Sequence, residues 1–112
     1  MINLYVDDIR KCPDNFIVAR TYSDAIEKLN NNNINILSLD HDLGIIDGTE
    51  MTGYDIVKYI CNNDIKINEI YIHTDNVVGR QNMYETLLGA QRRNIIDKNI
   101  KIHPYSYAKN EI

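Results

Sequence analysis

The chain has 112 residues, enough for one domain with a hydrophobic core and too few for two, so we expect a single domain over residues 1–112. Its net charge of −4 gives no basic face for long nucleic acid, which proteins bind mainly through lysine and arginine. No apolar stretch approaches the ~20 residues of a membrane span, and two cysteines without CxxC spacing lead us to expect a cytoplasmic protein with reduced thiols.

The first part of the chain contains three predicted strands and one predicted helix. Ile2–Val6 and Phe16–Ala19 are short apolar runs, which are typical of buried strands. Thr21 is expected to begin a helix, because Asp24 three residues later completes a capping pattern. This helix ends in a run of asparagines, and Ile34–Leu39 is the third predicted strand.

The second part of the chain continues the alternation of strands and helices. A loop containing Asp47-Gly48 leads to a second helix, which begins at Thr52 with the same capping pattern. Glu69–Ile72 is the fourth predicted strand, and a third helix is expected to begin near Gly79-Arg80. Ile100–Ile102 is the last predicted strand.

This alternation predicts an α/β fold with an open, parallel, five-stranded sheet, about three helices and both faces of the sheet covered. There is no internal repeat and no linker composition that would indicate a domain boundary. In open parallel sheets, ligands bind beyond the carboxyl ends of the strands. The functional residues should therefore be found just after the predicted strands.

Acidic residues follow two of these strands. Asp7 and Asp8 come after the first strand, and Asp40 and Asp42 come after the third. Neighbouring carboxylates repel one another unless a cation neutralises them, and oxygen ligands suit Mg²⁺ or Mn²⁺. Zn²⁺ is the second choice, because no two histidines have the close spacing of a zinc motif. The alternative is that these aspartates only cap a loop and a turn.

Histidines follow three of the strands. His41, His73 and His103 each lie at or just after a predicted strand end, so parallel strands would bring three imidazoles to one edge of the sheet. Imidazole titrates near neutral pH, and two such side chains would serve as acid and base for chemistry on a phosphate. The alternative is that each histidine is a hydrogen-bonded structural residue.

Polar side chains also surround the predicted start of the third helix. Asn76, Arg80 and Asn82 lie close together in sequence, and Thr74 precedes them. A helix N-terminus offers free N–H groups to anions, and the arginine fork matches phosphate oxygens. The alternative is that Asn76 is an N-cap and that Arg80 is solvated.

The order of these residues resembles that of response-regulator receiver domains. Asp7-Asp8, Asp40 and Thr74 match the receiver order, as does the pair His103-Pro104, although receivers have Lys-Pro there. Only about nine residues separate the first two predicted strands, and eight follow Pro104. Because parallel crossovers usually take a dozen or more residues, the first and last receiver helices should be reduced or missing.

The closer resemblance is to the cyclic-phosphate processing receiver domains, and it covers almost the whole chain. The motifs that carry it are Val6-Asp7-Asp8-Ile9-Arg10 with Pro13, Leu39-Asp40-His41-Asp42-Leu43-Gly44, Thr52-Gly53-Tyr54-Asp55, His73-Thr74-Asp75-Asn76 and Gly79-Arg80-Gln81-Asn82-Met83. The resemblance implies a receiver-like, flavodoxin-like fold. It also adds Arg10 to the site as a phosphate clamp.

We therefore expect a metal-dependent phosphoesterase acting on a cyclic phosphate, either a cyclic nucleotide or a 2′,3′-cyclic phosphate end of RNA. Asp40 would join Asp7 and Asp8 at the metal, His41 and His73 would act as base and acid, and the charge on the transition state would be stabilised by His103, Thr74 and Arg80. The expected partner is a small phosphorylated ligand. We expect no association with a membrane, and the sequence does not indicate the oligomeric state.

Three tyrosines are candidates for stacking on a base, namely Tyr54, Tyr105 and Tyr107. Two other functions remain open at this point. One is a signalling domain that uses Asp40 as a phosphoacceptor, and the other is a non-catalytic binder of a cyclic nucleotide.

Overall fold

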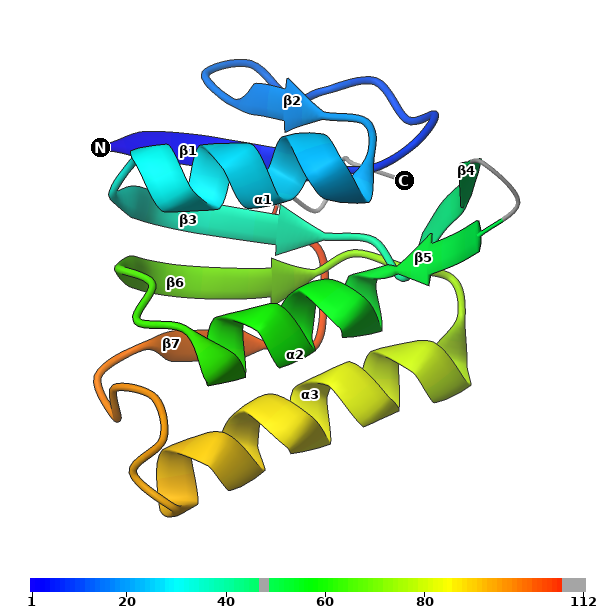
Figure 1. The fold of residues 1–112 in the computed structure, drawn as a ribbon. Coiled ribbons are helices and arrows are strands. Elements are labelled where there is room, and N and C mark those ends of the chain that lie inside the picture. The colour runs from blue at the N-terminus through cyan, green and yellow to red at the C-terminus, as the bar shows by residue number, and fades with distance from the viewer. Residues whose placement is uncertain (47–48, 108–112) are drawn as a thin grey trace.

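The computed structural model describes residues 1–46 and 49–107, and a five-stranded parallel sheet lies at its centre (Figure 1). The strands follow the order β2-β1-β3-β6-β7, with bounds β1 (Ile2–Val6), β2 (Ile17–Ala19), β3 (Ile34–Leu39), β6 (Ile67–Ile72) and β7 (Lys101–His103). Numbered within this sheet alone, the order is 2-1-3-4-5, which is the flavodoxin-like order. The predicted receiver-like α/β fold is confirmed.

Three helices connect these strands, and each begins at a side-chain cap. They are α1 (Tyr22–Asn31), α2 (Gly53–Asn62) and α3 (Val77–Arg92). The hydroxyls of Thr21 and Thr52 accept backbone N–H groups as predicted, and Thr52 forms a full capping box with Asp55. The carboxamide oxygen of Asn76 caps α3, so this helix begins earlier than the expected start near Gly79. No helix among the described residues is long and apolar enough to cross a membrane.

A hairpin stands where the sequence predicted a loop. Strand β4 (Asp42–Ile46) pairs antiparallel with β5 (Thr49–Thr52), whereas Asp47 and Gly48 of the predicted loop lie outside the described residues. The pairing is irregular between Asp42 and Ile45, and Gly44 within that stretch has a φ of +77°, a conformation that glycine adopts without strain. The hairpin extends beyond the carboxyl ends of the sheet strands (Figure 1).

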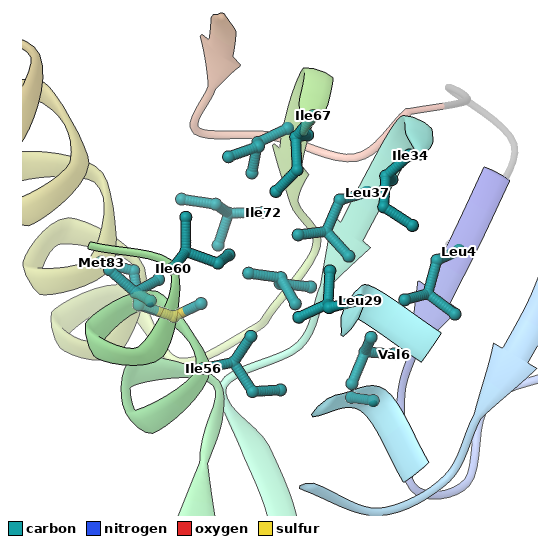
Figure 2. Packing of buried hydrophobic residues seen from close by; sticks show 14 of the residues in the cluster. Leu4, Val6, Leu29, Ile34, Leu37, Ile56, Ile60, Ile67, Ile72 and Met83 are labelled. Atoms are coloured by element: carbon teal, nitrogen blue, oxygen red, sulfur yellow. The ribbon is translucent and has the colours of Figure 1, made fainter. Parts of the chain in front are cut away.

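All three helices lie on one face of the sheet, as Figure 1 shows. The hydrophobic core is formed between that face and the helices. Figure 2 shows side chains from β1, β3 and β6 packed against side chains from the helices, among them Leu4, Val6, Leu29, Ile34, Leu37, Ile56, Ile60, Ile67, Ile72 and Met83. The sequence predicted that both faces would be covered, and in the described part of the chain the helices cover only one of them. Neither residues 7–16 nor residues 104–107 form a helix, which confirms that the first and last receiver helices are missing there.

Aromatic side chains cover the face of the sheet that the helices leave open. Tyr5 on β1 is only 1% exposed and packs edge-on against Phe16. After β7 the chain crosses this face, where Tyr107 packs against both Phe16 and Tyr71. A short aromatic segment thus does for this face what helices do for the other, since it removes the strand side chains from water.

Gly53 joins α2 to the end of β3 through a close backbone approach. Its N–H donates to the carbonyl of His41 at 2.7 Å, and an added Cβ would overlap the carbonyl oxygen of Asp40. We expect Gly53→Ala to lower the free energy of unfolding by roughly 1–3 kcal/mol, because the backbone must shift to admit the methyl group. Chemical denaturation measures this change.

Gly89→Ala in α3 is the matched control. The methyl group there would meet only Arg92 Nη2 at 3.6 Å, an ordinary contact. Replacing a glycine inside a helix by alanine should leave stability unchanged or raise it by up to about 1 kcal/mol. Equal effects of the two substitutions would show that the approach of Gly53 to Asp40 does not constrain the fold.

Candidate functional site

Three carboxylates meet where the order of the strands reverses. Asp7 and Asp8 follow β1, and Asp40 follows the neighbouring strand β3. Each contributes one oxygen to a group of atoms that all lie within 4.8 Å of one another. Asp42, also considered as a ligand, is not part of this group, because it lies on the hairpin with its side chain 62% exposed and its Oδ1 beside His41. We call Asp7, Asp8 and Asp40 the acidic cluster.

The two buried members of the acidic cluster have opposite pKa shifts. Burial by itself raises the pKa of Asp7, but hydrogen bonds from His73 and from the N–H groups of Arg10 and Ile9 outweigh it and lower this pKa to about 2. Burial, and next the charge of Asp7, raise the pKa of Asp40 above its usual value. The repulsion of Asp40 by a carboxylate that stays ionised is the electrostatic situation that a bound cation relieves.

His73 lies beneath the acidic cluster, inside the protein. Its Nε2 is 3.0 Å from Asp7 Oδ2, and its Nδ1 is 2.6 Å from the hydroxyl of Ser38. The ring stacks on Tyr5 with centroids 4.3 Å apart, and the side chain has no exposed surface. Both ring nitrogens are thus engaged, and His73 is not open to a ligand.

His41 has a different environment at the surface of the site. Its Nδ1 lies 2.9 Å from Asp42 Oδ1 and 3.3 Å from the carboxamide nitrogen of Asn76. The ring packs against the first turn of α3, where a Cβ on Gly79 would come within 2.5 Å of it. The side chain is 19% exposed, so His41 remains within reach of solvent.

His103 is turned away from the acidic cluster. Its Nε2 lies 2.8 Å from Glu69 Oε2, its Nδ1 lies 3.1 Å from the hydroxyl of Tyr105, and its ring stacks on Tyr71. The three histidines share no hydrogen-bond partner among the described residues, so their imidazoles have separate environments. Tyr105 and Tyr107, considered for base stacking, lie with His103 on the helix-free face.

Arg10 links the two loops that border the acidic cluster. Its guanidinium donates to the carbonyl of His73 at 3.1 Å and to Asp75 Oδ2 at 2.8 Å, while its Nε is 3.9 Å from Asp7. These contacts make Arg10 a structural bridge between the two loops, whereas the phosphate clamp that the family resemblance implied stays a prediction. Arg20, which sequence reasoning missed, directly follows β2 and donates to the carbonyls of Asp7 and Arg10, so it holds the same loop.

The start of α3 lies beside the acidic cluster, as the sequence predicted for several of its residues. The Thr74 hydroxyl bonds to the Asp40 carboxylate, and Arg80 Nη1 donates to the Thr74 carbonyl at 3.1 Å. Asn76 is the N-cap of α3, as the simpler alternative held. Asn82 instead lines a groove between α2 and α3 together with Tyr54.

Comparison with protein families identifies the chain. The family model described as the cyclic-phosphate processing receiver domain matches residues 2–89. The chain belongs to this family. Comparison with curated proteins gives no match, and comparison with solved structures gives none. The match confirms the resemblance seen in the sequence and ties this receiver domain to cyclic-phosphate processing. The matched segment contains the whole acidic cluster and ends before His103.

The bridge formed by Arg10 gives a prediction for the dynamics of this receiver domain. Arg10→Met should speed amide hydrogen exchange in the loop between β1 and β2, because the bridge to Asp75 is lost. The global free energy of unfolding should fall by less than about 1 kcal/mol, since Asp75 is 90% exposed. Hydrogen exchange read by mass spectrometry measures the local effect.

Lys11→Met is the control for Arg10→Met. It removes the same charge from the same loop, but Lys11 is exposed and makes no ion pair among the described residues. Exchange in β3 should stay unchanged in both variants. If Arg10→Met leaves the loop as protected as Lys11→Met does, the bridge does not order the loop.

Proposed function

We propose that this receiver domain is a metal-dependent phosphoesterase that hydrolyses a cyclic phosphate, such as a cyclic nucleotide or a 2′,3′-cyclic phosphate end of RNA. The observation that carries the proposal is the acidic cluster, whose three carboxylate oxygens lie within 4.8 Å of one another at the end of the sheet. Ligands bind at this position in open α/β sheets. Membership of the cyclic-phosphate processing family supports the same substrate chemistry.

The donor chemistry of the acidic cluster fits a hard divalent cation. Asp7, Asp8 and Asp40 would hold Mg²⁺ or Mn²⁺ through oxygen, whereas Zn²⁺ remains the second choice because the cluster contains no imidazole. When bound, the cation would polarise a phosphoryl oxygen and lower the pKa of the attacking water. Arg10 comes within 3.9 Å of Asp7 but is engaged by His73 and Asp75, so it only partly balances the charge.

Hydrolysis adds a water oxygen to phosphorus, breaks one P–O bond of the ring and moves a proton from the water to the departing oxygen. His41 is the better placed of the two expected acid–base residues. Its Nε2 has no hydrogen-bond partner among the described residues, and Asp42 orients the ring through Nδ1. His73 is left out of proton transfer, because both of its nitrogens are bonded inside the protein.

The first turn of α3 would bind the phosphate oxygens. Arg80 is fixed by the carbonyl of Thr74 through Nη1, and its Nη2 and Nε have no partner among the described residues. The nearby backbone N–H groups at the N-terminus of α3 favour an anion. His103 has no part in this binding, since it is bonded to Glu69 and Tyr105 on the helix-free face.

The first prediction from this proposed function concerns turnover. The purified protein should open the phosphate ring of at least one candidate substrate in the presence of Mg²⁺ or Mn²⁺. The candidates are cyclic mononucleotides, cyclic dinucleotides and oligonucleotides ending in a 2′,3′-cyclic phosphate. Mass spectrometry and ³¹P NMR detect the linear product. His41→Ala should lower this turnover by about a hundredfold or more, which is the usual size of a general acid–base contribution.

Three results would change the assignment. Tight binding of a cyclic nucleotide that is recovered intact would favour the non-catalytic binder. A single phosphate adduct after incubation with acetyl phosphate, absent in Asp40→Asn, would favour the phosphoacceptor. A substrate that is opened equally well in chelator would remove the metal from the proposal.

The second prediction concerns the metal itself. Titration of Mg²⁺ or Mn²⁺ by calorimetry should give one binding event per chain, and Asp40→Asn should weaken it by roughly tenfold or more, because affinity for hard cations follows the number of charged ligands. Asp42→Asn is the matched control, since Asp42 lies outside the acidic cluster. Equal weakening by both substitutions would point to a general charge effect.

A further inference from the structure

His73 is a buried ionisable group that the proposed hydrolysis does not use. It is 1% exposed, and its three partners come from two neighbouring strands: Tyr5 on β1, Asp7 just after β1 and Ser38 on β3. A polar ring in this position costs free energy unless both nitrogens are bonded, and both are. Ser38 is itself fully buried, so its hydroxyl is available only to neighbours inside the protein.

The direction of these hydrogen bonds follows from the nature of Asp7. Its Oδ1 accepts the N–H groups of Ile9 and Arg10 at 2.9 and 2.8 Å, as an ionised carboxylate does. An ionised carboxylate is only an acceptor, so Nε2 of His73 must carry a hydrogen. In the neutral ring, Nδ1 is then a lone-pair acceptor, and the hydroxyl of Ser38 donates to it at 2.6 Å.

We propose that Ser38 and His73 are positioning residues that orient the carboxylate of Asp7 toward a divalent cation, through a chain running from the Ser38 hydroxyl to Nδ1 and from Nε2–H to Oδ2. This inference rests on the cation site of the proposed function. With Oδ1 held by two backbone N–H groups and Oδ2 held by the imidazole, the carboxylate cannot rotate about its Cβ–Cγ bond without breaking a hydrogen bond.

The hydrogen bonds from Ser38 through His73 to Asp7 affect the orientation of the Asp7 carboxylate as well as the packing of the core. Stacking on Tyr5 and the burial of the ring contribute to the stability of the fold in any case. The hydroxyl of Ser38 adds little volume, but by donating to Nδ1 it holds the ring in the orientation that presents Nε2–H to Asp7. Replacing a residue that hydrogen-bonds to a metal ligand typically weakens metal binding by tenfold to about a hundredfold.

The first test needs no metal. A long-range ¹H–¹⁵N spectrum of the wild-type domain, recorded above the usual pH range of imidazole titration, reports the tautomer of each histidine. His73 should carry its hydrogen on Nε2, with Nδ1 as an unprotonated acceptor. A His73 that carries its hydrogen on Nδ1 would overturn the inference.

The second test compares two serine substitutions by Mg²⁺ or Mn²⁺ calorimetry on folded protein. Ser38→Ala should weaken binding on the order of tenfold, whereas Ser23→Ala on the exposed side of α1 should not change it. Unchanged affinity in Ser38→Ala, with tight binding in the wild type, would overturn this inference alone and leave the proposed function standing. A wild-type domain that binds neither cation would remove the proposed metal site and the positioning role together.

Discussion

The carboxyl edge of this domain is organised around one buried negative charge, that of Asp7. A carboxylate with no exposed surface is stable in its ionised form only when several donors reach it, and here they come from distant parts of the chain. The loop after β1 folds so that Ile9 and Arg10 offer their N–H groups, and β6 ends where His73 offers its imidazole. The same requirement brings Asp40 close to a carboxylate that stays ionised, and this repulsion is what the proposed cation would relieve.

Much of the fold was predictable because each predicted strand is a short apolar run and two helices begin with a capping pattern. The hairpin was missed because its irregular pairing around Gly44 gives β4 no regular alternation of apolar and polar residues. The spacing of apolar residues along a helix also does not show on which side of the sheet that helix packs. Here the helices share one side because residues 7–16 and 104–107 form no helix, and among the described residues aromatic side chains pack over the second face.

The acidic cluster was predictable from the sequence, since Asp7, Asp8 and Asp40 directly follow strands that became neighbours. The histidines were not, because their environments depend on strand register. His103 pairs with Tyr71, two residues before His73 on the adjacent strand, so it stops short of the edge and lies along the aromatic face. The roles of Ser38 and Tyr5 could have been suspected only from the alternation of side chains along β1 and β3.

The hairpin also bears on how such domains can vary. Asp42 pairs directly with Thr52, so the chain leaves the carboxyl edge and returns to the same place before α2 begins. Gly44, near its base, is the point at which the hairpin passes Asp8, and from there it extends away from the sheet (Figure 1). Residues can therefore be added to or removed from the far end of the hairpin without moving Asp40 or α2. The hairpin is a natural position for grafting new contacts beside an unchanged set of carboxylates.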